Sequence, residues 1–445
     1  MTALPLDALG EPAIPFPGYA RGRIDDEVVN PDLYASGEID GLFTRLRRED
    51  PVRLMKPRGY RPFYSIVKHA DILEIEKRND IFLNGLRTYL SPIEGEEWVK
   101  SVTGDTHLFR TLVDLDDPLH MKLRALTQSF FMPPNLRKLN ERIAALAREH
   151  VDRMAALGGR CDFVKEIALW YPLRVLMMIM GLPREDEDFL MKMTQEIFGP
   201  GDPDVAAQTQ NVTEDASGLH GQADRGVDLA KTAMQLYEYF GKVTADRRAS
   251  PRDDLCSVIA NGRVDGELIG EREAMSYYII VATAGHDTTS STAAGGLLEL
   301  IRAPGEMEKL KADPGLMPNA VEEMIRWVTP VKHFMRTATE DFRLRDTTIR
   351  AGEALCLHYP SGNRDEDVFE APFEFRVDRQ VAKQVAFGHG VHLCLGMHLA
   401  RLEIGALFAE LLPRLDEIAL DGEPRNTRAN FVSGLKTLPV RYRMR

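Results

Sequence analysis

The chain has 445 residues, of which 44% are hydrophobic, and a formal net charge of −12. The acidic balance argues against nucleic acid or an anionic membrane surface as general partners. The four cysteines are too widely spaced for a disulfide framework, and three are interpreted as small buried hydrophobes: Cys161, Cys256 and Cys356. The N-terminus has no basic and apolar leader. The longest apolar stretch falls short of the ~20 residues that a membrane span needs, so we expect a cytoplasmic protein.

No linker interrupts the chain, so we expect one domain over residues 1–445, although a length prior alone would allow three. Residues 1–30, rich in proline and glycine, are expected to form an extended N-terminal segment. A short β-like piece follows at 63–67. Apolar residues at helical spacing then predict helices over 136–156 and 167–180.

The polar segment 198–228 predicts a mobile lid connection, because a long loop inside a compact domain is usually a lid or a linker. The helical pattern resumes at 229–248. The longest predicted helix, 271–302, contains no proline, and its middle is apolar on nearly every side, which indicates a central position. Short strands and turns follow residue 337, and a last helix runs from just after Cys394 to about residue 412. These elements predict a mostly α fold with a small β region.

The segment from residue 387 to residue 396 concentrates three glycines around a cysteine: Gly388, Gly390, Cys394 and Gly396. Glycine permits backbone conformations and close approaches that side chains would block. Such a loop can direct amide N–H groups at the sulfur, and the helix that follows places its positive end there. Both effects favour a thiolate, the form of cysteine that binds metals.

Two other interpretations of this segment stay open from the loop alone. The first is a glycine turn before a helix, with an incidental cysteine. The second is a zinc site, because four nitrogen or sulfur ligands within ten residues are plausible zinc chemistry: His389, His392, Cys394 and His398. Structural zinc ligands usually come as two separated pairs, and a zinc site would leave the glycines without a role.

Two further patterns lie on predicted helices. Glu323 and Arg326 are three residues apart, so they share a helix face, where the ordinary interpretation is a weak surface ion pair. Asp287 and Thr288 lie in the apolar middle of the longest helix, where an unpaired acid is costly. Thr288 can donate a hydrogen bond to the carbonyl of Ala284, one turn earlier.

Together these motifs resemble those of the cytochrome P450 family, in the expected order, from about residue 30 to the C-terminus. Phe387-x-x-Gly390-x-x-x-Cys394-x-Gly396 is similar to the family's haem-loop signature. Glu323-Met-Ile-Arg326 resembles its E-x-x-R pair, and residues 284–289 resemble its oxygen-activation motif. The wording of residues 161–163, 283–291 and 334–338 is most similar to the bacterial branch that hydroxylates α-terpineol.

The resemblance implies a single-domain haem-thiolate monooxygenase with haem b between the helix 271–302 and the Cys394 loop. Cys394 would be the iron ligand, and Asp287 and Thr288 would be catalytic, by relaying protons during oxygen activation. The implied haem-binding residues are His120, Arg124, Ala284, Gly285, Arg336, Phe387, Gly388, His392, Cys394 and Gly396. Arg379 would join Glu323 and Arg326 in a structural triad. His286 is interpreted as ordinary packing.

One departure from the family concerns a haem carboxylate contact. Many bacterial members have histidine three residues before the loop phenylalanine, but this chain has Gln384, whose amide cannot carry charge. The implied pocket residues are Thr283, Ala284, Phe334 and Val432, and the implied substrate is small, apolar and cyclic, such as a monoterpenoid or an alkyl-aromatic compound.

The implied reaction inserts one atom of O2 into a C–H bond, with electrons from a ferredoxin and its reductase. A basic cluster is a hypothetical docking surface for that ferredoxin: Lys122, Arg124, Arg137, Lys138 and Arg142. The alternatives are a peroxide-driven haem-thiolate enzyme and a haem-binding sensor without enzymatic activity. Neither of them needs the pair Asp287–Thr288.

Overall fold

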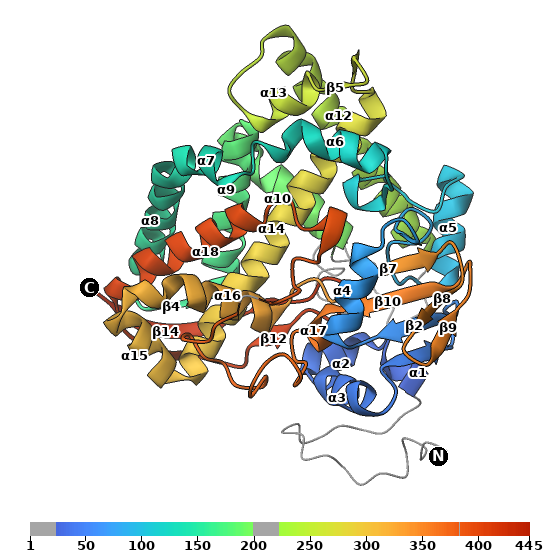
Figure 1. Cartoon of the computed structure of the whole chain (residues 1–445). Helices are drawn as coiled ribbons and strands as arrows, with labels where there is room; N and C mark the ends of the chain where they lie inside the picture. The colour runs from blue at the N-terminus through green and yellow to red at the C-terminus, as the bar shows by residue number, and fades with distance from the viewer. Residues whose placement is uncertain (1–23, 199–221, 382) are drawn as a thin grey trace. The chain divides into compact units, whose positions relative to one another are not determined.

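The computed structural model describes residues 24–198, 222–381 and 383–445, which fall into two compact units (Figure 1). The first unit contains residues up to 97, residues 302–394 and residues 425–434. The second unit contains residues 98–301, 395–424 and 435–445. In both units helices are more extensive than strands, as the sequence patterns predicted.

A five-stranded sheet organises the first unit, with strand order β1-β2-β10-β7-β3 (Figure 1). Only β10 and β2 run parallel, and the other neighbours are antiparallel. Its strands are β1 (Val52–Met55), β2 (Phe63–Ile66), β3 (Phe82–Leu83), β7 (His333–Ala338) and β10 (Ala354–His358), and a hairpin is formed by β8 (Phe342–Leu344) and β9 (Thr347–Ile349). All five positions of β10 are buried, which fits a central strand covered on both faces.

The first unit also contains short helices. They are α1 (Ile24–Glu27), α2 (Pro31–Ser36), α3 (Ile39–Glu49), α4 (His69–Lys77), α15 (Pro304–Ala312), α16 (Met317–Val328) and α17 (Tyr359–Gly362). Two of them, α2 and α15, begin at proline, whose missing N–H costs nothing there. Helix α5 (Ile93–Thr103) continues the chain into the second unit, and β12 (Arg425–Asn426) belongs to the first.

Helices of four to 32 residues form most of the second unit: α6 (Leu119–Gln128), α7 (Pro133–Leu136), α8 (Asn140–Ala156), α9 (Trp170–Met180), α10 (Glu187–Phe198), α12 (Gln222–Ala249), α13 (Leu255–Ala260), α14 (Glu271–Arg302) and α18 (Met397–Leu411). Its strands are β4 (Arg160–Asp162), β5 (Arg263–Val264), β6 (Glu267–Leu268), β11 (Leu415–Leu420), β13 (Leu435–Thr437) and β14 (Pro439–Met444). Strands β11, β14 and β4 pair antiparallel in that order, and α18 packs along α8.

The helix boundaries follow the predictions with local differences. The 32 residues of α14 coincide with the predicted range. The helix expected over 136–156 begins at Asn140, because Arg137–Leu139 form a tighter 3₁₀ turn after α7. Helix α9 begins at Trp170, directly after a π-helical turn over Val164–Ala168, so the helix expected over 167–180 is not α-helical throughout.

Two predicted segments need correction where they are described. In the expected extended segment 1–30, Ile24–Glu27 form a helical turn, and residues 1–23 lie outside the described residues. In the expected connection 198–228, residues 199–221 also lie outside the described residues. Helix α12 begins at Gln222 rather than at 229. It includes Gly226, which costs a helix only about 1 kcal/mol relative to alanine.

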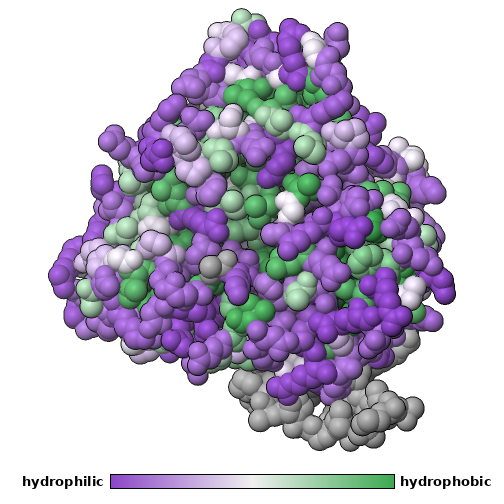
Figure 2. Space-filling model, in the orientation of Figure 1, coloured by the Kyte–Doolittle hydropathy of each residue, from purple (hydrophilic) through white to green (hydrophobic). Residues whose placement is uncertain are grey.

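Most of the buried residues are apolar, as expected for a protein with a hydrophobic interior. The face in Figure 2 is mainly hydrophilic, with smaller hydrophobic areas between. Within the residues that the structure describes, no helix combines the length and the apolar character needed to cross a membrane.

Candidate active site

The Cys394 loop in the first unit depends on two glycines in the left-handed region. Gly388 has φ +68° and Gly390 has φ +69°. A Cβ atom on Gly390 would lie 2.1 Å from the backbone oxygen of Glu76, so no side chain fits there without movement of the backbone. The Cys394 N–H donates to the carbonyl of Phe387 at 2.9 Å, which closes the loop on itself. The partly exposed Cys394 therefore lies on a constrained turn.

The surroundings of Cys394 fit a flat, apolar cofactor with a thiolate ligand. Each residue from Ala386 to Cys394 is at least partly exposed, although Phe387, Val391 and Leu393 are apolar. Within the described ranges no group of three or more His, Cys, Asp or Glu side chains is placed to hold a metal ion, so the zinc interpretation has no geometric support. A single cysteine on a constrained, partly exposed loop is a donor that haem iron can accept.

Arg336, an implied haem carboxylate partner, is 3% exposed on β7 and has protein partners. Its Nη1 donates to the carbonyl of Met335 at 2.8 Å, and its Nη2 donates to Oε1 of Glu76 at 3.2 Å. The hydroxyl of Tyr359 donates to the same oxygen at 2.7 Å. Burial raises the pKa of Glu76 to about 7, against the opposing effects of Arg336, Tyr359 and the backbone of His389. The sequence analysis did not identify Glu76.

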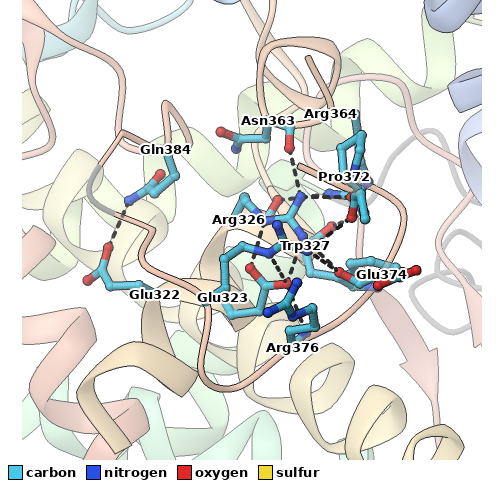
Figure 3. A network of polar contacts seen from close by, with 12 residues as sticks. Glu322, Glu323, Arg326, Trp327, Asn363, Arg364, Pro372, Glu374, Arg376 and Gln384 are labelled. Atoms are coloured by element: carbon cyan, nitrogen blue, oxygen red, sulfur yellow. Dashed lines mark hydrogen bonds and ion pairs between the residues drawn. The ribbon is translucent and has the colours of Figure 1, made fainter. Parts of the chain in front are cut away.

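The structure brings Glu323, Arg326 and Arg379 together in a buried network of the first unit. Figure 3 shows Glu323 and Arg326 at its centre. Arg326 Nε donates to Glu323 Oε2 at 2.7 Å, and Arg379 Nε donates to Glu323 Oε1 at 3.2 Å. Neither the Glu323 nor the Arg326 side chain is exposed at all, which separates this pair from an ordinary surface ion pair. Arg326 also donates to the carbonyls of Asn363 and Pro372. The network therefore connects α16 to the irregular segment that precedes the Cys394 loop.

Gln384, at the position of the family's histidine, has protein partners at both ends of its amide. Its Nε2 donates to Oε2 of Glu322 at 3.3 Å (Figure 3), and its Oε1 accepts from the N–H of Ala386 at 2.6 Å. These contacts give the side chain a local structural role at the base of the loop.

In the second unit, the centre of α14 is open at the oxygen-activation motif. The Thr288 hydroxyl donates to the carbonyl of Ala284 at 2.8 Å, as the i, i+4 spacing allowed. Ala284 is exposed, and Gly285 and Thr288 are partly exposed, although much of the rest of this helix is buried. Thr283, in contrast, is 2% exposed and donates to the carbonyl of Ile279. The open stretch of α14 is therefore small and mostly apolar.

Asp287 has a neighbour that the sequence analysis had interpreted as ordinary packing. The fully buried ring of His286 places Nδ1 3.1 Å from Oδ1 of Asp287. Burial raises the pKa of Asp287, and the charge of His286 opposes this shift. A carboxyl group with a raised pKa is better able to exchange protons near neutral pH than an ordinary surface aspartate.

Helix α6 carries two other implied haem partners, His120 and Arg124. His120 is buried, with Nδ1 3.4 Å from Oδ1 of Asp117. Burial lowers the pKa of His120, and the neighbouring Arg124 charge adds to the effect. His120 is therefore suited to donate a hydrogen bond as a neutral imidazole, while Arg124 supplies positive charge.

Of the predicted substrate-pocket residues, Phe334 and Val432 belong to the first unit, and Thr283 and Ala284 belong to the second. The ring of Phe334 lies 5.6 Å from that of Phe431 and 6.0 Å from that of Tyr89. Val432 pairs with Val331 through an isolated β-bridge. In the first unit these residues adjoin a cluster of aromatic rings.

Comparisons with known proteins agree with these features. The family model named Cytochrome P450 matches residues 95–314 and 315–444. The chain is 40% identical to cytochrome P450-terp from a Pseudomonas species, over 95% of each chain. It is 31% identical to a methyl-branched lipid omega-hydroxylase of Mycobacterium tuberculosis, over 97% of this chain and 96% of that protein. The crystal structure of CYP108D1 from Novosphingobium aromaticivorans is similar, with a TM-score of 0.86 and 39% identity, covering 95% of this chain and 98% of the other. The chain belongs to the cytochrome P450 family of haem-thiolate monooxygenases.

Proposed function

We propose that the protein inserts one oxygen atom of O2 into a C–H bond of a compact, mostly apolar cyclic substrate. Cys394 would be the protein ligand of the haem b iron, and this assignment is carried by its position on the glycine-constrained loop described above. A thiolate-ligated haem supplies oxygen activation when it is bound, since the thiolate donates electron density that favours O–O cleavage. The remaining roles belong to side chains of this chain.

The haem carboxylates would be held by Arg336, Arg124, His120 and His392. Phe387, Gly388 and Gly396 would shape the loop on the ligand side, and Ala284 and Gly285 would provide a surface without bulky side chains. The network of Glu323, Arg326 and Arg379 would keep the chain before the loop in place without taking part in catalysis.

The proton supply is assigned to Thr288 and Asp287. The Thr288 hydroxyl would hold a proton donor in place, since its own proton is directed to the carbonyl of Ala284 and its oxygen can still accept. Asp287, whose pKa burial raises, would exchange protons with His286 and solvent. This pair supports an O2-dependent enzyme, because a peroxide-driven enzyme or a haem-binding sensor does not need such a proton supply.

A monoterpenoid or an alkyl-substituted aromatic compound is the proposed substrate class. The support is the 40% identity to cytochrome P450-terp and the likeness of residues 283–291 and 334–338 to the α-terpineol-hydroxylating branch. The proposed electron donors are a ferredoxin and its reductase. The cations proposed to receive the ferredoxin are partly or fully exposed, although Lys122 also pairs with Asp265 at 2.6 Å.

The test of the haem assignment is the absorption spectrum of the reduced, CO-bound protein. We expect Cys394→Ser and Cys394→Ala to abolish the red-shifted Soret band that thiolate ligation produces, and Cys356→Ala, at a buried cysteine of β10, to keep it. Retention of the band in Cys394→Ala would overturn the ligand assignment. Titration of the ferric protein with monoterpenoids, alkylbenzenes and methyl-branched lipids, followed by the Soret shift, then tests the substrate class.

A further inference from the structure

Glu76, near the C-terminal end of α4, is a meeting point for three segments of the first unit. Its Oε1 accepts from Arg336 of β7 at 3.2 Å and from Tyr359 of α17 at 2.7 Å. The third segment is the Cys394 loop, whose His389 backbone N–H lies close enough to lower the pKa of the carboxyl group. The Glu76 residue is only 4% exposed, so these contacts replace water.

The backbone of the Cys394 loop packs closely against Glu76 at Gly388 and Gly390. A Cβ atom on Gly388 would lie 3.3 Å from Oε1 of Glu76, and one on Gly390 would overlap the Glu76 backbone oxygen. Among the described residues, Oε2 of Glu76 has no hydrogen-bond partner of acceptable geometry. Glu76 therefore has a buried oxygen that can take up a proton without breaking a hydrogen bond.

The groups that contact Glu76 include one cation, the guanidinium of Arg336. The groups that face it are Arg336 from β7, Tyr359 from α17 and His389 from the loop. Burial raises the pKa of Tyr359 well above 10 and lowers the pKa of His389, so both stay neutral at pH 7. If Arg336 also holds a haem carboxylate, as the proposed function requires, one guanidinium faces two carboxyl groups. A buried excess of negative charge is costly, and protonation of Glu76 removes it.

We propose that Glu76 is a proton-linked positioning residue, which joins Arg336 to the Cys394 loop and takes up a proton when haem binds. This inference rests on the proposed function, because it assigns Arg336 to a haem carboxylate. The carboxyl group already has a pKa of about 7, and a second carboxylate beside Arg336 raises it further. The contribution of Glu76 to haem binding is then favourable at low pH, where Glu76 is protonated, and is lost as the pH rises above 7. The proton that Cys394 loses on binding iron acts in the opposite sense, and it does so equally in wild type and in variants of Glu76.

The experiment measures the rate of haem transfer from the holoprotein to excess apomyoglobin between pH 6 and 8. One linked proton changes affinity by at most about tenfold per pH unit, so we expect the wild-type rate, divided by the Glu76→Gln rate, to rise several-fold across this range. Glu76→Gln, which resembles the protonated state, should release haem more slowly than wild type at pH 8 and at a similar rate at pH 6. The control is Asp71→Asn, which removes a buried carboxylate of the same helix that pairs with Arg345 at 2.6 Å. It should keep the wild-type slope.

A second measurement counts the protons exchanged when haem is added to the apoprotein in weak buffer at pH 7.5, detected with a pH indicator. Cys394 must lose its thiol proton to bind the iron, whereas Glu76 takes up a proton. Wild type should therefore release fewer protons than Glu76→Gln. Equal pH slopes for wild type and Glu76→Gln, or equal proton release by the two proteins, would overturn the inference. In that case a normal spectrum of the reduced, CO-bound wild type would leave the proposed function intact, whereas loss of that spectrum would reject the function itself.

Discussion

Replacement of Glu323 by glutamine removes a negative charge from the centre of the buried network and leaves a side chain of similar size and shape. One Glu323 oxygen accepts from Arg326 Nε at 2.7 Å. The other accepts from Arg326 Nη2 at 2.7 Å, from the Arg376 backbone N–H at 3.1 Å and from Arg379 Nε at 3.2 Å. The carboxylate thus compensates two guanidinium groups whose side chains are 0% and 7% exposed.

The expected cost follows from this burial. An exposed ion pair contributes about 0–1 kcal/mol, whereas removal of one partner from a buried pair costs about 3–5 kcal/mol, because the other charge stays buried without compensation. Arg326 keeps its bonds to three carbonyls, which offset part of the loss, so we expect about 3 kcal/mol for Glu323→Gln. This is a large part of the 5–15 kcal/mol that typically stabilises a folded protein.

Urea unfolding of the holoprotein, followed by far-UV circular dichroism and by the Soret band, measures this cost. The matched control is Glu322→Gln, since Glu322 is the adjacent residue of α16 and is partly exposed. It should change the free energy of unfolding by less than about 1 kcal/mol. Similar small losses in both variants would refute the argument from burial.

Three further predictions concern the site itself. Thr288→Ala should bind haem and substrate normally but divert reducing equivalents into hydrogen peroxide, measured as NADH consumed against product formed, and unchanged coupling would remove its proton role. Gly390→Ala should lower the free energy of unfolding by more than about 2 kcal/mol, because the φ of +69° is strained for alanine and its Cβ would overlap the Glu76 oxygen. Gly95→Ala, where nothing lies within 4 Å, is its control and should be neutral or stabilising in the same unfolding assay. Lys138→Glu should slow ferredoxin-supported turnover at low salt but not peroxide-supported turnover, with the difference shrinking as salt rises; equal rates at low salt would mean that this surface is merely solvated.

Features set by spacing along the chain could be predicted from the sequence. The i, i+4 spacing allowed the hydrogen bond from Thr288 to Ala284, and the i, i+3 spacing put Glu323 and Arg326 on one face. Absence of proline and a continuous apolar pattern gave the bounds of α14. In each case the backbone of one helix determines which side chains meet, so tertiary packing is not needed to predict the contact.

Contacts between residues far apart in the chain, and the charge states that depend on these contacts, were decided by the tertiary structure. Glu76 and Arg336 are 260 residues apart, and nothing in the local pattern of α4 distinguishes Glu76 from a solvated acid. The contact of Gln384 with Glu322 and the lowered pKa of His120 likewise depend on which groups packing buries together. A sequence shows which residue types are available, but burial and the distance to the nearest charge determine whether a carboxyl or an imidazole is ionised, and both arise only when the chain folds.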